Sequence, residues 1–311
     1  MKRFTQPKVI ASGLVAGLIA SFPPGAARAG DTIFETNQGS NPSDGTIGAY
    51  TTSGAPLNPA LISDLSFPRA IAVSGADIFV GNAGNGTIGE YTTSGAVVNA
   101  NLITGLAGPF GIAVSGSLFI TSFGGGSIGE YTTSGAVVNA NLITGLSRPF
   151  GIVVSGSNIF VVNTNGSIGE YTTSGTTVNA SLITGLTSPT AIAVAGSDIF
   201  VANSGNGTVG KYTTSGATEN AALISVLGTP FGVAVSGSDL FVADSLNGTI
   251  GEYTTDGAIV NAALISGLNN PAGLVVSSGV PEPSTWAMSL IGFASLAFAG
   301  FRRARSSGVS V

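Results

Sequence analysis

Residues 189–228 read P-T-A-I-A-V-A-G-S-D-I-F-V-A-N-S-G-N-G-T-V-G-K-Y-T-T-S-G-A-T-E-N-A-A-L-I-S-V-L-G. Four short apolar runs lie in this stretch: A-I-A-V, D-I-F-V-A, T-V-G-K-Y-T-T and E-N-A-A-L-I-S-V-L. Gly, Ser, Asn or Pro separates each run from the next. Short runs bounded by turn residues are typical of β-strands. The stretch therefore predicts four strands joined by tight turns.

The same unit recurs along the chain, with successive landmarks 40 or 41 residues apart. One landmark is the Tyr of the Y-T-T motif, at Tyr50, Tyr91, Tyr131, Tyr171, Tyr212 and Tyr253. The other is the Pro before the first strand, at Pro68, Pro109, Pro149, Pro189, Pro230 and Pro271. A period near 40 with four strands per unit indicates β-propeller blades. Short runs rich in Gly and β-branched residues disfavour a helical solenoid.

The two ends of the repeat region predict how the propeller closes. Asp31-Thr-Ile-Phe matches the second strand of the unit, as in Asp77-Ile-Phe-Val, whereas Pro271-Ala-Gly-Leu-Val-Val matches a first strand with nothing following it. Pairing the two ends in one shared blade uses every strand and leaves no orphan sheet. We therefore expect an all-β, six-bladed propeller with four strands per blade, spanning residues 30–279.

Residues 230–257, P-F-G-V-A-V-S-G-S-D-L-F-V-A-D-S-L-N-G-T-I-G-E-Y-T-T-D-G, resemble the NHL repeat family, and the resemblance extends over about residues 31–279. It implies a propeller, often six-bladed, that serves as a binding platform; some related propellers are metal-dependent lactonases or lyases. Thr or Ser replaces the charged residue usual before the strand-three Ile, so the resemblance concerns the scaffold. A WD-type propeller is disfavoured, because the chain has no His and its single Trp lies outside the repeats.

Composition excludes several kinds of chemistry. With no Cys and no His, the chain has no disulfide, no Ser-His-Asp triad and no imidazole-ligated zinc. Residues 30–279 contain 14 acidic and 3 basic residues (Arg69, Arg148 and Lys211), a net charge of 3 − 14 = −11. This charge disfavours nucleic acid and anionic lipid headgroups as partners.

The N-terminal 29 residues have the pattern of a secretory signal peptide. Lys2, Arg3 and Lys8 precede an apolar stretch over residues 9–22, and Ala27 and Ala29 provide small residues for cleavage after Ala29. An uncleaved N-terminal anchor is the alternative. Either reading predicts export of the propeller.

The C-terminus combines three elements in a fixed order. Val280-Pro281-Glu282-Pro283 is followed by roughly 18 apolar residues, enough for one transmembrane helix. Arg302, Arg303 and Arg305 follow, with residues 306–311 as a cytoplasmic tail. Residues 280–305 thus resemble the PEP-CTERM sorting signal, a motif also described as an ice-binding-protein C-terminal domain.

The sorting signal implies an exosortase-type processing enzyme as partner and transient anchoring in the cytoplasmic membrane. It further implies delivery to the cell envelope or the extracellular matrix, in company with exopolysaccharide. A plain single-pass anchor is the alternative.

Candidate ligand-binding residues lie on one predicted face. The loops after the second strands begin at Asn82, Asn163, Asn203 and Asp244. Their oxygens suit Ca²⁺ or sugar hydroxyls, but tight hairpins need the same Asn-Gly sequences, and a single carboxylate makes a poor calcium site. We therefore expect no metal and no cofactor. Phe110, Phe150 and Phe231 follow the repeat Pro, where they either stack on a sugar or, as we expect, pack between blades.

The repeats favour a scaffold over a catalyst. Residues 88–106 and 128–146 are identical, whereas an active site needs different groups at different places. We expect a non-catalytic binding or structural module of the cell envelope or exopolysaccharide matrix. The alternatives are a metal-dependent hydrolase or lactonase using Asp244, Asn163 and Asn203, and a platform for a surface protein.

Overall fold

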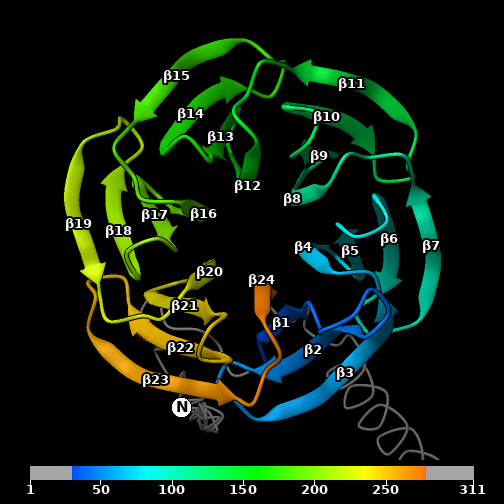
Figure 1. Cartoon of the computed structure of the whole chain (residues 1–311), viewed down its shortest axis with the longest axis horizontal. Coiled ribbons are helices and arrows are strands. Elements are labelled where there is room, and N and C mark those ends of the chain that lie inside the picture. The colour runs from blue at the N-terminus through cyan, green and yellow to red at the C-terminus, as the bar shows by residue number, and fades with distance from the viewer. Residues whose placement is uncertain (1–29, 278–311) are drawn as a thin grey trace, which may run out of the picture.

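A computed structural model describes residues 30–277, which fold into six four-stranded sheets around a central axis (Figure 1). The predicted all-β six-bladed propeller is confirmed. The predicted signal peptide and the C-terminal apolar segment lie outside the described residues. Between residues 30 and 277, no helix is long and apolar enough to cross a membrane.

Each blade has an inner, a second, a third and an outer strand. The inner strands are β4 (Pro68–Ser74), β8 (Pro109–Ser115), β12 (Pro149–Ser155), β16 (Pro189–Ala195), β20 (Pro230–Ser236) and β24 (Pro271–Ser277). The second strands are β1 (Thr32–Asn37), β5 (Asp77–Asn82), β9 (Ser117–Ser122), β13 (Asn158–Asn163), β17 (Asp198–Asn203) and β21 (Asp239–Asp244).

The third strands are β2 (Gly45–Thr51), β6 (Thr87–Thr92), β10 (Ser127–Thr132), β14 (Ser167–Thr172), β18 (Thr208–Thr213) and β22 (Thr249–Thr254). The outer strands are β3 (Pro56–Leu65), β7 (Val97–Ile103), β11 (Val137–Ile143), β15 (Thr177–Ile183), β19 (Thr218–Ile224) and β23 (Ile259–Ser266). The blades are numbered 1 to 6 from the blade that contains β1.

Blade 1 joins the two ends of the repeat region, as the sequence predicts. Its strand order is β24-β1-β2-β3, and β24 runs antiparallel to β1 with Ser277 opposite Thr32. The predicted alignment of the first strand is wrong by one residue. Thr32 pairs with Thr51 as Asp77 pairs with Thr92, so Thr32, and not Asp31, occupies the position of Asp77.

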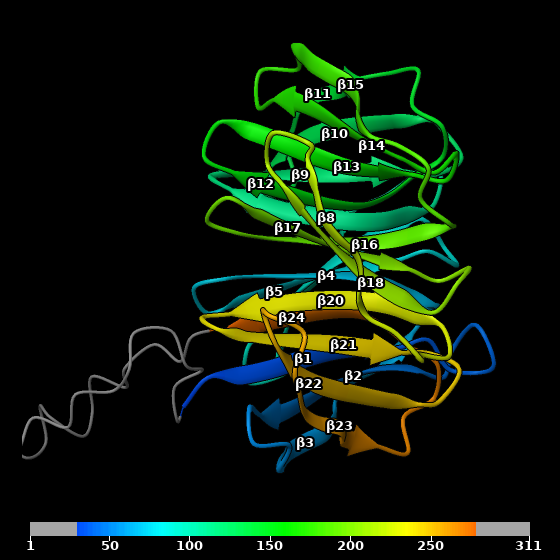
Figure 2. The same ribbon diagram turned by 90° about the vertical axis from the view of Figure 1, so that its left-hand side faces the viewer.

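The antiparallel order divides the loops between two faces of the propeller. We call upper the face that carries the hairpins between second and third strands and the links from each outer strand to the next blade. The lower face carries the hairpins after the inner strands and the Thr-Thr-Ser-Gly turns. β1 begins and β24 ends on the lower face, which lies to the left in Figure 2.

The blades are held together by one repeated apolar contact. The second strand of every blade carries a buried Phe: Phe34, Phe79, Phe119, Phe160, Phe200 and Phe241. Each Phe packs against the second-strand residues and the repeat Tyr of the following blade; Phe160, for example, packs with Ile199, Val201 and Tyr212. Burying such a side chain contributes about 1.5–3 kcal/mol. The six contacts together fix the blades into a closed propeller.

A Gly-x-Tyr motif in the third strand explains another invariant feature of the repeats. The Tyr ring lies over the Gly two residues earlier on the same strand, so a Cβ on Gly169 would lie 2.7 Å from the Cε2 atom of Tyr171. Tyr171 is itself buried and has little room to move. The third strand therefore requires Gly at this position.

We expect Gly169→Ala to lower the free energy of unfolding by about 1–3 kcal/mol, the usual cost of overpacking. Without the contact, Ala in a strand would be favoured over Gly, so the sign of the effect is diagnostic. Urea unfolding measures the change. In a Tyr171→Val background the cost should shrink, because the clashing ring is gone. A Gly169→Ala protein more stable than the wild type would contradict this account.

Blade 1 breaks the pattern of the second strands with a buried acid. Glu35 occupies the position that Val80, Val161 and other aliphatic residues hold elsewhere, and its exposed fraction is 0%. It shares a side of β1 with Ile33, which packs against Phe241 of blade 6. Oε1 accepts a hydrogen bond from Asn37 at 2.7 Å, whereas Oε2 has no partner among the described residues. Burial raises the pKa of Glu35 to about 8.

The raised pKa predicts a pH-dependent weakness at the blade 6–blade 1 interface. The folded protein keeps a proton that the unfolded chain loses above its ordinary pKa near 4.5. The contribution of Glu35 to stability is therefore fully present below about pH 4.5 and is lost as pH rises through about 8. Tyr50 lies nearby, and burial together with the Glu35 charge raises its pKa to about 12.

We expect Glu35→Val to raise the free energy of unfolding at pH 8 by about 2–4 kcal/mol, because an aliphatic side chain of similar volume replaces a buried acid. Urea unfolding between pH 4 and 9 measures the change. Glu35→Gln should also remove this part of the pH dependence, without the gain from apolar packing. An unchanged pH profile in both variants would show that Glu35 does not cause the dependence.

Candidate functional site

Aromatic side chains and one arginine close the upper mouth of the central channel. Phe110 and Phe150 have ring centroids 4.8 Å apart, and Phe150 and Phe231 have centroids 5.5 Å apart although they belong to blades 4 and 6. The guanidinium carbon of Arg69, from blade 2, lies 4.7 Å from the Phe110 centroid and 5.4 Å from that of Phe231. These four side chains thus meet across the axis. We call them the mouth cluster.

A bulge in each inner strand turns these side chains toward the axis. In blade 4, Pro149 pairs with Asn163 but Ile152 pairs with Val161, so β12 holds one extra residue between the two pairs. Phe150 lies in this bulge and escapes the alternation that buries Ile152 against a neighbouring blade. The sequence interpretation that these Phe residues pack between blades holds in part for Phe150, which packs against the apolar cluster between blades 4 and 5. Phe110, Phe150 and Phe231 also contact one another or Arg69 at the mouth, and the second-strand Phe residues form the main blade contacts.

Two further residues extend the mouth cluster on one side. Phe123, in the hairpin of blade 3, stacks on Phe110 with centroids 4.5 Å apart. The guanidinium carbon of Arg148 lies 5.7 Å from the Phe123 centroid. Arg148 is exposed, and its backbone φ of 47° is the left-handed value that a non-glycine residue adopts only under constraint. Sequence reasoning assigned no role to Phe123 or Arg148. The position of Arg148 directly before a repeat Pro, like that of Arg69 directly after one, is a signal that could have pointed to it.

The channel has two different halves. A cavity of about 80 Å³ adjoins the mouth cluster and is lined by Arg69, Phe110, Phe150, Thr190 and Phe231 together with inner-strand backbone. A larger cavity of about 290 Å³ lies toward the lower face, lined only by Ile, Leu, Val and Ala of the six inner strands. Charged and aromatic groups thus gather at the upper end of the channel alone.

The predicted ring of amide and carboxyl oxygens does not form around the mouth. The Asn82, Asn163, Asn203 and Asp244 side chains are each at most 3% exposed. Asn82 shares a side of β5 with Ile78 and Val80, which pack against Phe34 of blade 1. The side chain therefore points into a blade interface. The Oδ1 atoms of Asn82, Asn163 and Asn203 have no partner among the described residues, and we have no physical account of this.

Asp244 acts as a brace for the upper loops. Its carboxylate accepts hydrogen bonds from the Gly228 amide at 2.7 Å, the Thr229 amide at 2.9 Å and the Asn247 side chain at 2.8 Å. These bonds tie the link entering blade 6 to the hairpin of the same blade. Within residues 30–277, no group of three or more acidic side chains is placed to hold a metal ion.

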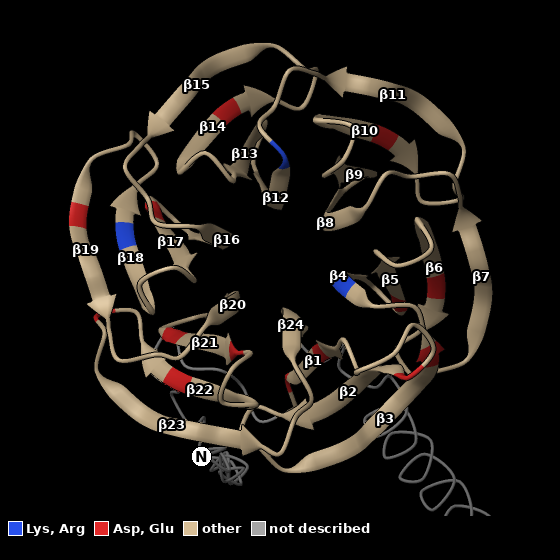
Figure 3. Cartoon of the chain, viewed as in Figure 1, with Lys and Arg blue, Asp and Glu red and all other residues tan. Residues whose placement is uncertain are grey.

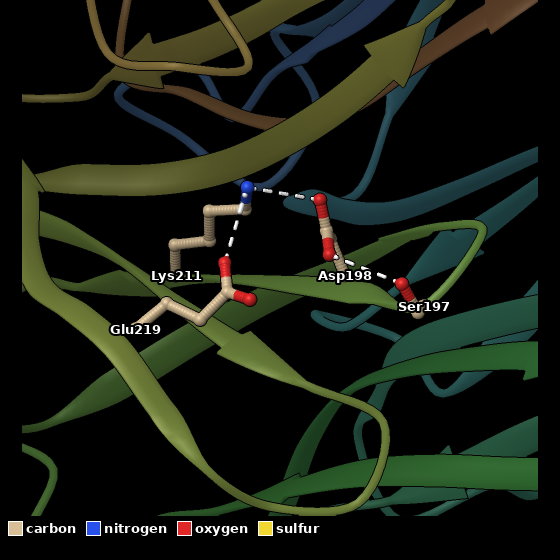
Figure 4. Close-up of polar contacts among 4 residues, drawn as sticks. All are labelled: Ser197, Asp198, Lys211 and Glu219. Atoms are coloured by element: carbon tan, nitrogen blue, oxygen red, sulfur yellow. Dashed lines mark hydrogen bonds and ion pairs between the residues drawn. The ribbon is translucent and has the colours of Figure 1, made fainter.

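The charged groups of the third strands lie away from the channel. Lys211 bridges Asp198 and Glu219 at 3.0 and 3.1 Å on one side of blade 5 (Figure 4). In blade 4 the equivalent residue is Glu170, which is buried and accepts a hydrogen bond from Asn158 at 2.8 Å. In blade 2, burial and the nearby Asp77 carboxylate raise the pKa of Glu90. These contacts are local to each blade.

We expect Asp244→Ala to lower the free energy of unfolding by about 1–3 kcal/mol, because two loop amides lose their acceptor. Asp244→Asn should cost less, since Asn is native at this position in blades 2, 4 and 5. Thermal unfolding of both variants measures the difference. Equal stability of the Ala variant and the wild type would mean that the brace contributes nothing.

Comparisons with known proteins agree with this architecture. The PEP-CTERM protein-sorting motif matches residues 279–304, which include Val280–Pro283, Arg302 and Arg303. No curated protein matches the chain.

Solved structures resemble the propeller at low sequence identity. A nidogen/laminin complex contains a chain with a TM-score of 0.68 and 16% identity, covering 79% of this chain and 98% of that one. A streptogramin B lyase has a TM-score of 0.57 and 21% identity, covering 81% and 95%. Virginiamycin B lyase from Staphylococcus aureus has a TM-score of 0.58 and 18% identity, covering 82% and 94%. At such identities the likeness concerns the fold alone. The chain is thus a six-bladed β-propeller that carries a PEP-CTERM sorting motif.

Proposed function

We propose that this protein is a non-catalytic binding module of the cell envelope or exopolysaccharide matrix, which presents the upper face of its propeller to a matrix ligand. The sorting motif marks a propeller for export and surface sorting. An exosortase-type enzyme recognises the motif, and an N-terminal signal peptide and transient membrane anchoring belong to the same proposal. The resemblance to NHL repeats, which usually serve as binding platforms, agrees with this role.

The single observation that carries the proposal is the position of the mouth cluster relative to the sorting motif. β24 ends at Ser277 on the lower face, and the motif begins at residue 279. The mouth cluster lies at the opposite end of the channel. A propeller held through its C-terminus therefore directs the lower face toward the membrane and the mouth cluster outward, where matrix components are accessible.

The chemistry of the upper face supports binding rather than catalysis. Aromatic faces and a guanidinium stack on sugar rings and bind polar groups. The only carboxylate among the predicted ligands, Asp244, is occupied by loop amides. The described residues offer no acid–base pair at the mouth cluster, and the proposal assigns none.

The test is retention of the full chain, in a non-ionic detergent, on the host's own extracellular polysaccharide with and without EDTA. We expect retention under both conditions, because the mouth cluster contains no metal ligands. Loss in EDTA alone would place a bound cation in the interaction. No retention under either condition would contradict a glycan-binding role and favour a surface protein as partner.

A footprint locates the binding face, because the chain contains no native Cys. Leu246→Cys places a thiol on the upper face, where Leu246 is 73% exposed, and Ser197→Cys places one on an exposed hairpin of the lower face. Polysaccharide should slow the reaction of a bulky maleimide at position 246 and leave position 197 unchanged. The reverse pattern would contradict the proposed orientation.

A further inference from the structure

Arg69 is a half-buried cation that forms no ion pair with a carboxylate among the described residues. Both ion pairs within residues 30–277 belong to Lys211, and the Arg69 guanidinium lies over the Phe110 and Phe231 rings. Burial lowers the pKa of Arg69, yet a guanidinium stays charged under all ordinary conditions. Withdrawing a charge from water is costly unless an opposite charge or strong acceptor meets it. The aromatic faces repay only part of this cost.

The charge distribution isolates this cation at the mouth. The repeats contain three basic residues. Arg69 is the second residue of β4 and Arg148 directly precedes β12, so both lie where an inner strand begins, whereas Lys211 lies on the third strand β18 (Figure 3). Asp44 and Asp244, two acids of the upper face, accept bonds from loop amides. Asp64, in the link entering blade 2, accepts a bond from the neighbouring Ser63 hydroxyl. The mouth cluster is therefore a small positive site on a protein that is otherwise strongly acidic.

The size of the adjoining cavity limits what the site accepts. The cavity of about 80 Å³ beside the guanidinium has room for a carboxylate and several waters. The exposed parts of the Phe110 and Phe231 rings flank the guanidinium. Phe123 and Arg69 cover the two faces of the Phe110 ring, so a sugar that sends one carboxylate to Arg69 meets the exposed part of the Phe231 ring.

A nucleic acid or a phosphate-rich polymer suits the site poorly. Such ligands bind through many lysines and arginines along a groove, whereas residues 30–279 contain three basic residues in all. A neutral sugar leaves the guanidinium unpaired. A sugar with a single carboxylate per residue satisfies Arg69 in the bidentate manner that guanidinium favours, and it provides an apolar ring face for stacking.

We propose that the mouth cluster recognises a carboxylated sugar, a uronic acid residue of an acidic polysaccharide. Arg69 pairs with the carboxylate and Phe231 contacts the sugar ring, while Phe110 supports the guanidinium. This inference rests on the proposed function, because it names the ligand of the same face. Arg148, exposed beside Phe123, adds a second positive charge for a neighbouring residue of the polymer.

The test compares two ligands that differ only in charge. The full chain in non-ionic detergent with EDTA is titrated calorimetrically with hexagalacturonate and with the methyl ester of the same hexasaccharide. We expect the ester to bind at least about tenfold more weakly, because a charge-assisted hydrogen bond to Arg69 is lost. Raising the salt concentration should weaken binding of the acid and not of the ester.

Matched variants assign the effect to Arg69. Arg69→Gln should bind the acid no better than the ester, whereas Lys211→Gln, which removes the same charge far from the mouth, should behave as the wild type. If Arg69→Gln does not fold, Arg69→Thr replaces it, because Thr190 is native at the equivalent position of blade 5. Thermal unfolding confirms that the variants are folded.

Each result decides between the two proposals. Equal binding of acid and ester by the wild type, or equal binding of the acid by wild type and Arg69→Gln, overturns the carboxylate inference and leaves glycan binding intact. Retention on host polysaccharide without binding of either oligosaccharide overturns the uronic acid assignment. Failure to bind any of these glycans overturns both proposals.

Discussion

The contact on which the structure depends is the wedge between a second-strand Phe and the Ile, Val and Tyr of the next blade. It recurs at all six interfaces and accounts for the largest fully buried side chains, such as Phe79, Phe160, Phe200 and Phe241. Each blade contributes a Phe to the contact with the next blade, and its second-strand residues and Tyr to the contact with the preceding one. The stability of every blade therefore depends on both neighbours. The sixth interface carries Glu35 in place of an aliphatic residue, so the interface that joins the chain ends is also the one with a buried acid.

The arrangement at the mouth follows from a separate constraint. The inner-strand bulge releases one residue per blade from the pairing ladder, and that residue faces the axis. These residues are Arg69, Phe110, Phe150, Thr190, Phe231 and Ala272. The positions around them are nearly the same in every blade, whereas these six comprise three Phe, one Arg, one Thr and one Ala. The propeller thus varies the residue at the channel mouth more than it varies the residues of the blade interfaces.

The period of the Tyr and Pro landmarks was enough to predict the blade number, the four strands and the shared blade, because turn chemistry and alternation act locally. The Phe residues of the mouth were harder to place. Alternation predicts the direction of a side chain only while the register holds, and the bulge at Phe150 interrupts it. Glu35 was missed for a related reason. A one-residue misalignment of the first strand hid the fact that an acid stands where Val80 stands in blade 2.

The shared blade sets an order of events for an exported chain. β1 leaves the translocation channel first and its partner β24 leaves last, so blade 1 stays a three-stranded sheet until about residue 277 has crossed. Until then β1 has no strand paired along its inner edge, and the apolar cluster between blades 6 and 1 lacks Leu274 of β24. The sorting motif follows at once, at residue 279. In a chain exported N-terminus first, closure of the propeller therefore coincides with the emergence of the sorting motif.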